Sequence, residues 1–284
     1  MHCPNCKSTN IIKYGNKQTK LGNKQIYKCI SCKKHFQETF IKNNQYKTSI
    51  IFKAISLYNL GNTIKQTQKI IAKQHNKTIP ISTIHSWIKQ YKICDFSKLR
   101  KKLKLSNPIK QHLFHHHQPY LMRIHTTKLK LTKNKQLQAY IKHITNYNIN
   151  ISALTQCSEA CKTYKKQQQT KKTKHEATEF TKIVIDLSQK NQDRHSILQN
   201  LMLTNDKSTI VTELPIYNNK YIGHIDVLQY KNNSFQILEY KPIINNTCFN
   251  QVRLYKYLLA NNLNINFKNI QAFVFNENEC YKVY

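Results

Sequence analysis

Two periods of hydrophobicity divide the last third of the chain into helices and strands. Runs of β-branched and aromatic residues predict strands, and apolar residues that recur every three or four positions predict helices. The predicted elements are a helix at 174–188, strands at 209–217, 221–230 and 234–241, a helix at about 247–261 and a strand at 270–276. Their order is α-β-β-β-α-β, which predicts an α+β domain over residues 171–284.

A β-hairpin is predicted where two of these strands meet, at residues 231–234 (KNNS). The two central asparagines tolerate the positive φ angles of a two-residue turn, so the residues on either side of them should pair. Counting outward along both strands then places Asp226 opposite Glu239 and His224 opposite Lys241. Because side chains alternate between the two faces of a strand, these four should share one face.

The opposed acids predict a site for a divalent metal ion. Opposed positions have Cβ atoms about 4.5–5.5 Å apart, where two carboxylates repel each other unless a cation lies between them. Mg²⁺ or Mn²⁺ held by Asp226 and Glu239 would activate a water molecule, while Lys241 would stabilise that water or the charge on a phosphate. We expect Gly223 to let a phosphate backbone approach, and His224 either to contact phosphate or to be structural.

These residues resemble the motifs of the PD-(D/E)XK nuclease superfamily, which has an Asp on one strand and (D/E)-x-K on the next. The motif here is Asp226 followed by Glu239-Tyr240-Lys241, and Gln251 and Tyr255 resemble the Q-x-x-x-Y of the RecB-like branch. The resemblance covers residues 171–284 and implies a restriction-endonuclease-like core that hydrolyses phosphodiesters. It also implies that Gln251 and Tyr255 belong to the catalytic set, although Tyr255 fits the apolar face of its helix equally well.

The resemblance further implies an acid on the first helix of this core. That helix offers Glu176 and Glu179, which are three residues apart, and His175 is the RecB-like equivalent. We assign Glu176 to the catalytic set, with Glu179 and His175 as alternatives. Glu213, on the strand that precedes Asp226, is a rival for the same role.

The start of the chain contains two C-x-x-C pairs, whose members are Cys3, Cys6, Cys29 and Cys32. Four thiolates at this spacing can complete a tetrahedral Zn²⁺ site, and a site filled by four cysteines leaves no open position for catalysis. We therefore predict a structural zinc ribbon over residues 1–40. The second pair and its flanks, YKCISCKKHF, resemble the zinc ribbons of insertion-sequence transposases.

Three helices are predicted after the ribbon, within residues 45–93. Apolar residues recur at helical spacing over 48–59, 63–75 and 81–92. The third segment resembles the recognition helix of transposase and homeodomain-like helix-turn-helix domains, whose polar face enters the major groove of DNA. The residues predicted to contact DNA are Thr83, His85, Ser86, Lys89 and Gln90.

The middle segment, residues 94–170, has a weaker pattern. It contains the basic run KLRKKLK at 98–104, a strand-like stretch at 121–131 and helix-like spacing over 135–168. We expect a basic linker or helical segment that follows the phosphates of a nucleic acid.

Charge identifies the expected partner. The chain has 46 Lys and Arg residues, 13 acids and a net charge of +33, and only Glu38 and Asp95 precede residue 159. So large an excess of positive charge is stable in a compact fold when a polyanion neutralises it, so we expect nucleic acid, most simply double-stranded DNA. No secretory signal or membrane-spanning apolar run is evident, which predicts an intracellular, cytoplasmic and nucleoid-associated protein.

Together these features predict a multidomain α+β protein that acts as a metal-dependent DNA endonuclease. The ribbon and the helix-turn-helix would select the site, and cutting both strands would require a homodimer. A mobile element or a defence system would suit this architecture. Two alternatives remain open: a non-catalytic DNA-binding regulator, and a nuclease that recognises RNA or repair intermediates by shape.

Overall fold

The computed structural model describes residues 3–36, 46–103, 108–146, 154–162, 168–188 and 191–284, apart from residues 4, 7, 20–21, 77, 92–93 and 117. The chain divides into two compact units, residues 1–52 and 53–284. Among the described residues, no helix combines the length and the apolar character that a membrane span requires.

The first unit contains a small antiparallel sheet. Strand β1 (Ile11–Thr19) pairs with β2 (Gly22–Cys29), and β2 pairs with β3 (His35–Phe36). Gly15, with φ of 146°, lies at a bulge in β1 where the register shifts. The sheet brings the first and second cysteine pairs to the same end of the ribbon, because β2 ends at Cys29.

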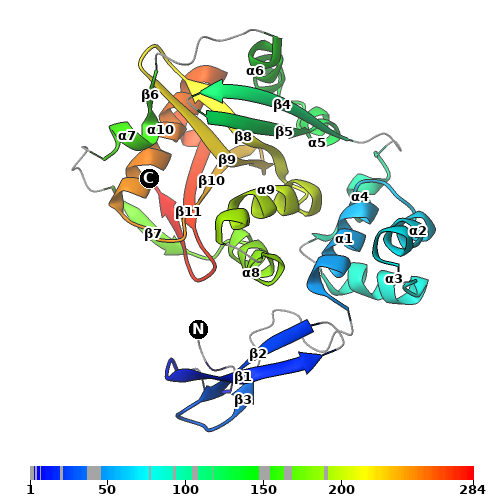
Figure 1. Cartoon of the computed structure of the whole chain (residues 1–284). Helices are drawn as coiled ribbons and strands as arrows, with labels where there is room; N and C mark the ends of the chain where they lie inside the picture. Colours follow the sequence, from blue (N-terminus) through cyan, green and yellow to red (C-terminus); the bar gives the residue numbers. More distant parts are fainter. Residues whose placement is uncertain are drawn as a thin grey trace. The chain divides into compact units, whose positions relative to one another are not determined.

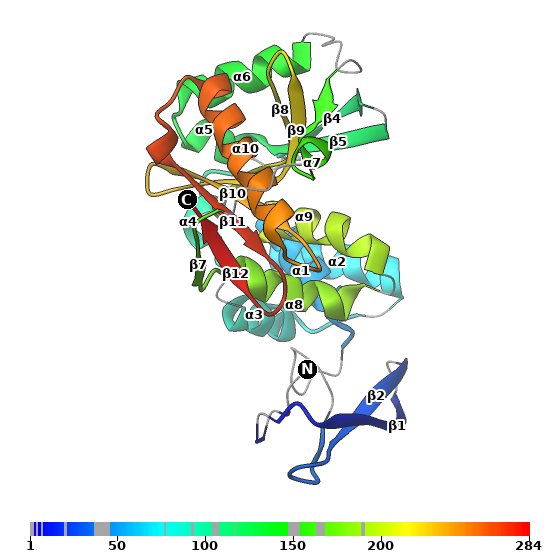
Figure 2. The ribbon, with the colours of Figure 1, turned by 90° about the vertical axis from the view of Figure 1, so that its left-hand side faces the viewer.

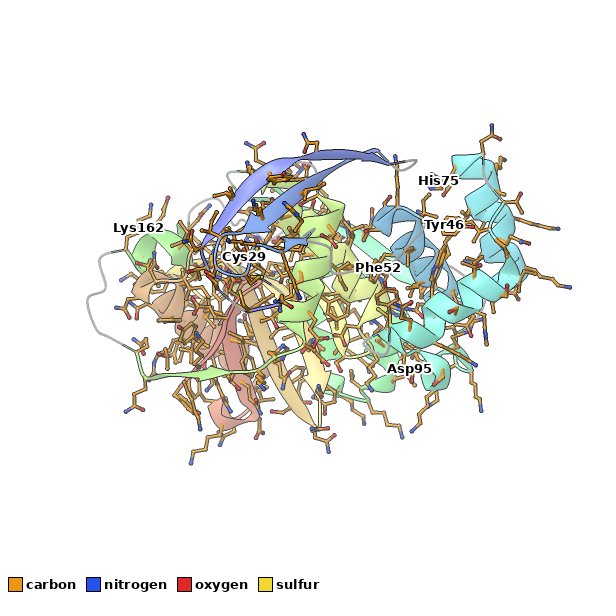
Figure 3. The ribbon with its side chains drawn as sticks, turned by 90° about the horizontal axis from the view of Figure 1, so that it is seen from below. Cys29, Tyr46, Phe52, His75, Asp95 and Lys162 are labelled. Atoms are coloured by element: carbon orange, nitrogen blue, oxygen red, sulfur yellow. The ribbon has the colours of Figure 1, made fainter. Side chains whose placement is uncertain are left out.

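Three helices follow, in agreement with the hydrophobic pattern. They are α1 (Thr48–Asn59), α2 (Ile64–His75) and α3 (Ile81–Gln90). Thr63 and Gln66 form a capping box at the start of α2, which satisfies backbone N–H groups that a helix leaves without partners. Ile84 and Trp87 of α3 are buried. Figure 3 shows long side chains extending outward along α2 and α3, with His75 at the end of α2.

The last turn of α1 packs against the C-terminal end of α9 (Arg194–Asn205). Asn59 Nδ2 donates a hydrogen bond to Asn205 Oδ1 at 3.0 Å, and Asn205 Nδ2 donates to Ser56 Oγ at 2.9 Å. Asn59 and Asn205 are almost fully buried. The Nδ2 groups of both amides and the Oδ1 of Asn205 have partners in this interface, which lowers the cost of burying them. The helices and the large sheet therefore belong to one compact unit.

A mixed sheet forms the centre of the second unit, and within the described residues it has nine strands (Figure 1). Its order is β4-β5-β8-β9-β10-β11-β12-β7, and β6 pairs with β9. Strands β10 and β11 are parallel, as a crossover through the long helix between them requires. The central elements are β8 (Thr209–Tyr217), β9 (Tyr221–Lys231), β10 (Ser234–Tyr240), α10 (Asn246–Leu263) and β11 (Ile270–Phe275).

These central elements confirm the predicted strands and helices to within one or two residues at most boundaries. The helix predicted at 174–188 is α8 (Ala177–Leu187). A second helix, α9, was not predicted, and it lies between α8 and β8. Strand β12 (Cys280–Val283) and the short strand β7 (Thr170–Thr173) extend the sheet beyond β11.

The middle segment differs from the basic linker that we expected. Strands β4 (Ile109–His116) and β5 (Gln118–His125) form a hairpin, and β5 pairs with β8, so this segment belongs to the sheet. The short helix α4 (Ser97–Arg100) covers only the first three residues of the run KLRKKLK at 98–104. The remaining elements of the segment are α5 (Thr126–Leu131), α6 (Lys135–Asn146), β6 (Thr155–Gln156) and α7 (Cys157–Ala160).

One apolar core lies between the sheet and helices α6 and α10. It includes Leu137 and Ile144 of α6, Val252 and Leu259 of α10, and Ile225 of β9. The buried residues of α8 and α9, such as Phe180 and Met202, are not members of this cluster. The two groups of helices therefore cover different parts of the sheet (Figure 2).

Candidate active site

The β9–β10 hairpin has the register that its turn predicts. Asn232 and Asn233 have φ of 52° and 57°, as a two-residue turn of this kind requires. The two strands pair from Ser234 with Lys231 through to Leu238 with Val227. The next position along both strands brings Glu239 opposite Asp226.

A third acid continues this line on β8. Strands β8 and β9 pair with Thr212 opposite Val227 and Leu214 opposite Ile225, so Glu213 lies beside Asp226. Glu213 has φ of 54°, a left-handed conformation that costs a non-glycine residue about 1 kcal/mol or more. Three carboxylates from three adjacent strands, Glu213, Asp226 and Glu239, therefore form one row across the sheet. We call them the carboxylate row.

His195, in the first turn of α9, completes the group. Its Nε2 is 2.8 Å from Asp226 Oδ1, and its Nδ1 is 3.7 Å from Glu213 Oε1. Gln199, one helical turn later, donates a hydrogen bond from Nε2 to Glu213 Oε1 at 2.5 Å. Helix α9 thus positions one imidazole and one amide over the row.

The other end of the row is held by Lys241 and by the backbone of β10. Lys241 Nζ is 3.0 Å from Glu239 Oε1. Asp226 Oδ2 accepts a hydrogen bond from the backbone N–H of Tyr240 at 2.9 Å. Glu239 is only 2% exposed, and its Oε2 has no hydrogen-bond partner among the described residues. A buried carboxylate oxygen of this kind is costly unless a cation approaches it.

The protonation equilibria reflect this crowding of negative charge. Burial, together with Asp226, raises the pKa of Glu239 to about 8 and that of Glu213 to about 7. Asp226 in turn raises the pKa of His195 to about 9. Burial also acts to raise the pKa of Asp226, but the adjacent His195 and Lys241 outweigh it and leave that pKa lowered. The row thus contains more carboxylates than His195 and Lys241 neutralise.

The donor atoms fit a single divalent ion. His195, Glu213 and Asp226 each offer one ligand atom, and these atoms lie within 4.8 Å of one another. Carboxylate oxygens suit Mg²⁺ and Mn²⁺, and a neutral imidazole nitrogen suits transition metals. The free Oε2 of Glu239 adds a further donor on the same row. This mixed set of oxygen and nitrogen atoms could therefore hold a metal ion.

A cavity of about 290 Å³ opens over the carboxylate row. Gln251 and Tyr255 of α10 line it, and Gln251 Nε2 donates to Tyr255 Oη at 2.7 Å. A Cβ added at Gly223 would lie 2.2 Å from Tyr255 Cε1. The glycine therefore makes room for the tyrosine ring, and it also lines the cavity, so the approach of a phosphate stays a prediction. His224 also lines the cavity and stacks on the Tyr120 ring, with centroids 3.7 Å apart.

The first-helix residues that we assigned from sequence lie elsewhere. Glu176 forms an ion pair with Lys231 at 3.1 Å and does not line the cavity. His175 accepts a hydrogen bond from the backbone N–H of Ala177 at 3.1 Å, so it caps the start of α8. Glu179 is exposed. The physical reason is that α9, the helix after α8, approaches the row, and its His195 takes the place that we gave to Glu176. Glu213, the rival assignment, is the acid that joins the site.

The four cysteines of the first unit lie close enough together to bind one zinc ion. Cys3 Sγ is 3.5 Å from Cys32 Sγ, and Cys6 Sγ is 3.5 Å from Cys29 Sγ. All four sulfur atoms lie within 4.8 Å of one another. Tetrahedral ligation with Zn–S bonds of about 2.3 Å places sulfur atoms roughly 3.8 Å apart, so the arrangement fits zinc.

The polar face of α3 is accessible. His85, Ser86, Lys89 and Gln90 are exposed, and Thr83 is partly exposed. The opposite face, with Ile84 and Trp87, is buried. The helix therefore presents all five predicted DNA-contacting residues to solvent to some degree, while its apolar face holds it in the bundle.

The comparisons with known proteins give no identity to this arrangement. No protein-family model matches the chain, and no curated protein matches it in sequence.

Proposed function

We propose that the protein is a metal-dependent nuclease that hydrolyses phosphodiester bonds in DNA. The observation that carries this proposal is the carboxylate row, with His195 at one end and Lys241 at the other, in a cavity open to solvent. A retired site would have no reason to keep three opposed carboxylates, since like charges in adjacent strands destabilise the sheet. The intact set therefore supports an enzyme over a regulator that only binds.

The roles of the residues follow from their positions. His195, Glu213 and Asp226 would hold the divalent ion, and Glu239 would add a further ligand through its Oε2. Bound there, the ion would lower the pKa of a water molecule and polarise the phosphate. Lys241 lies 3.0 Å from Glu239 Oε1, close enough to orient the attacking water and to stabilise the charge that develops on the phosphate oxygens. Gln199 fixes the orientation of Glu213.

Three features support DNA as the substrate. The cysteine cluster fits a zinc ribbon, the polar face of α3 is accessible, and only Glu38 and Asp95 oppose the basic residues that precede residue 159. Contacts between basic side chains and phosphates bind DNA without sequence preference and weaken steeply as salt rises. Side chains of a recognition helix that reach the edges of the bases read the sequence. We propose that the first 93 residues select the DNA that the carboxylate row cuts.

Incubation with supercoiled and linear DNA tests the proposal. We expect cleavage by the wild type in Mg²⁺ or Mn²⁺, and a loss of at least 100-fold in Asp226→Asn and in Lys241→Met, the order of magnitude for removing a group that stabilises the transition state. Glu176→Gln is the matched control, because Glu176 is an acid of the same domain that lies outside the cavity. Equal cleavage by all four proteins would contradict the proposal. Cleavage of RNA and not of DNA would support the alternative in which the substrate is RNA.

A further inference from the structure

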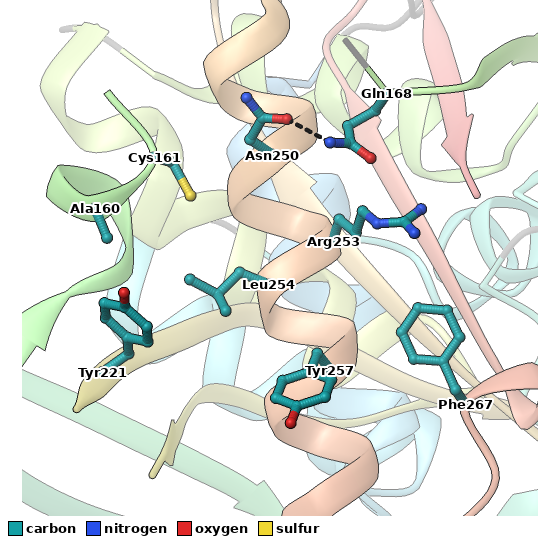
Figure 4. Close-up of a pocket in the computed structure, with 9 residues that line it drawn as sticks. All are labelled: Ala160, Cys161, Gln168, Tyr221, Asn250, Arg253, Leu254, Tyr257 and Phe267. Carbon is teal, nitrogen blue, oxygen red and sulfur yellow. Dashed lines mark hydrogen bonds between the residues drawn. The ribbon is translucent and has the colours of Figure 1, made fainter. Parts of the chain in front are cut away.

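A second cavity, of about 360 Å³, lies beside α10 (Figure 4). Three aromatic rings line it: Tyr221 at the start of β9, Tyr257 on α10, and Phe267 in the turn that follows α10. Leu254 contributes an aliphatic surface between them. Tyr257 is 52% exposed. The lining therefore offers flat apolar surfaces that are open to solvent.

Cations surround these rings. Arg253 lines the cavity, Lys256 Nζ lies 4.0 Å from the centroid of the Phe267 ring, and Lys220 Nζ lies 5.2 Å from that of Tyr221. Burial and the nearby charges of Arg253 and Lys282 lower the pKa of Lys256. Positive charges crowd together here, and no carboxylate is among the residues that line the cavity. A site of this kind attracts an anionic group with a flat apolar part.

The two cavities share the elements that separate them. On α10, Gln251 and Tyr255 line the active-site cavity, whereas Arg253, Leu254 and Tyr257 line the second one. On β9, residues 222–224 line the first cavity and Tyr221 the second. On α7, Cys157 lines the first cavity and Ala160 lines the second. The two cavities therefore adjoin the same three elements, α7, β9 and α10.

We propose that this second cavity binds an unpaired nucleobase of the nucleic-acid strand that the active site engages. The base would stack on Tyr257 and the neighbouring rings, and its phosphate would meet Arg253. Base stacking on aromatic side chains tolerates any sequence, because every base has a π face. Gln168 Nε2 donates to Asn250 Oδ1 at 2.8 Å, and both of these amides line the same cavity. The inference rests on the proposed function only for its choice of nucleic acid.

Photo-crosslinking tests the location of the base. The full chain with Asp226→Asn, which cannot cut, is mixed with a short single-stranded oligonucleotide that contains 5-iodouracil, irradiated, and digested for mass spectrometry. We expect adducts on Tyr221, Tyr257 or Phe267. Adducts confined to aromatic residues outside the cavity, such as Tyr27 of the ribbon or Trp87 of α3, would overturn the proposal. The proposal would also be overturned if an apolar small molecule blocked the crosslinks and a mononucleotide did not.

Affinity measurements separate stacking from structural effects. In the same Asp226→Asn background, Tyr257→Ala should weaken binding of the single strand by roughly 5- to 100-fold, the loss expected for one base–aromatic stack, whereas Tyr257→Phe should retain it. Lys182→Met, an exposed cation on α8 outside the cavity, is the control for charge. Equal affinity of Tyr257→Ala and Tyr257→Phe would overturn the inference. Because neither readout requires cleavage, an inactive wild type would refute the proposed function and leave this test intact.

Discussion

Replacing His195 with alanine tests whether this side chain completes a metal site. The imidazole is 2.8 Å from Asp226 Oδ1 and 3.7 Å from Glu213 Oε1, so its loss removes one ligand and a positively charged partner of both acids. Breaking a buried ion pair costs about 3–5 kcal/mol, and an exposed pair contributes under about 1 kcal/mol. The imidazole is 41% exposed and the Asp226 side chain only 9%. We therefore expect the metal-free variant to lose about 1–2 kcal/mol of unfolding free energy.

Two assays measure the consequences. Urea unfolding without divalent ions gives the change in stability, and titration of Mn²⁺ against the rate of DNA cleavage gives the apparent metal affinity. We expect that affinity to fall by at least 10- to 100-fold, since loss of a group that merely supports a ligand has this effect. His143→Ala is the matched control, because His143 is exposed on α6 and does not line the cavity. If His195→Ala kept the wild-type Mn²⁺ dependence, the reasoning would be refuted even if stability had fallen.

Three further predictions concern other parts of the molecule. Gly223→Ala should cost about 1–3 kcal/mol of unfolding free energy, because its Cβ would lie 2.2 Å from the buried Tyr255 ring. If Gly223→Ala cost just as much in a Tyr255→Ala background, this explanation would be contradicted. Lys128 donates to the carbonyls of Leu203 and Asp206, and burial lowers its pKa to about 7. The unfolded chain binds this proton up to about pH 10.4, so stability should rise between pH 7 and about pH 10, and Lys128→Met should flatten that slope; an unchanged slope in urea unfolding would argue against it. Zinc removal should unfold the ribbon and leave the second unit folded, as NMR would report, and loss of dispersed signals from residues 53–284 would count against two independent units.

The sequence predicted the centre of the site because local chemistry fixes it. The Asn232-Asn233 turn sets the register of β9 against β10, and that register alone places Asp226 beside Glu239. The spacing of the two C-x-x-C pairs likewise predicted the cysteine cluster, since the intervening residues have the length of a β-ribbon. In both places the partners are joined by one β-hairpin, so a single turn sets their relative positions.

His195 could not be found in the same way, because its contact with Asp226 is made through space. Helix α9 (RHSILQNLMLTN) mixes buried polar and apolar residues around its circumference, so the hydrophobic pattern did not predict it. Glu213 did carry a signal. Tyr217 pairs with Ile222, and counting outward from the four residues between them, 218–221, places Glu213 beside Asp226, just as counting from the next turn places Glu239 there.

The strand-like stretch predicted at 121–131 overlaps β5, but β4 was missed, for a different reason. Strand β4 (IKQHLFHH) lies at the edge of the sheet and exposes lysine, glutamine and histidine side chains along most of its length. Edge strands often carry polar and charged residues, which prevent further pairing and also remove the alternation that predicts a strand. The polar residues of β4, which hid the strand from the hydrophobic pattern, are therefore those of a sheet edge.

Anomalous diffraction from crystals soaked in Mn²⁺ tests the central claim most directly. We predict one Mn²⁺ peak within about 2.0–2.4 Å of ligand atoms of His195 and Asp226, absent in Asp226→Asn. A peak that persisted in that variant, or the absence of any peak at the carboxylate row while zinc was visible at the four cysteines, would contradict the account.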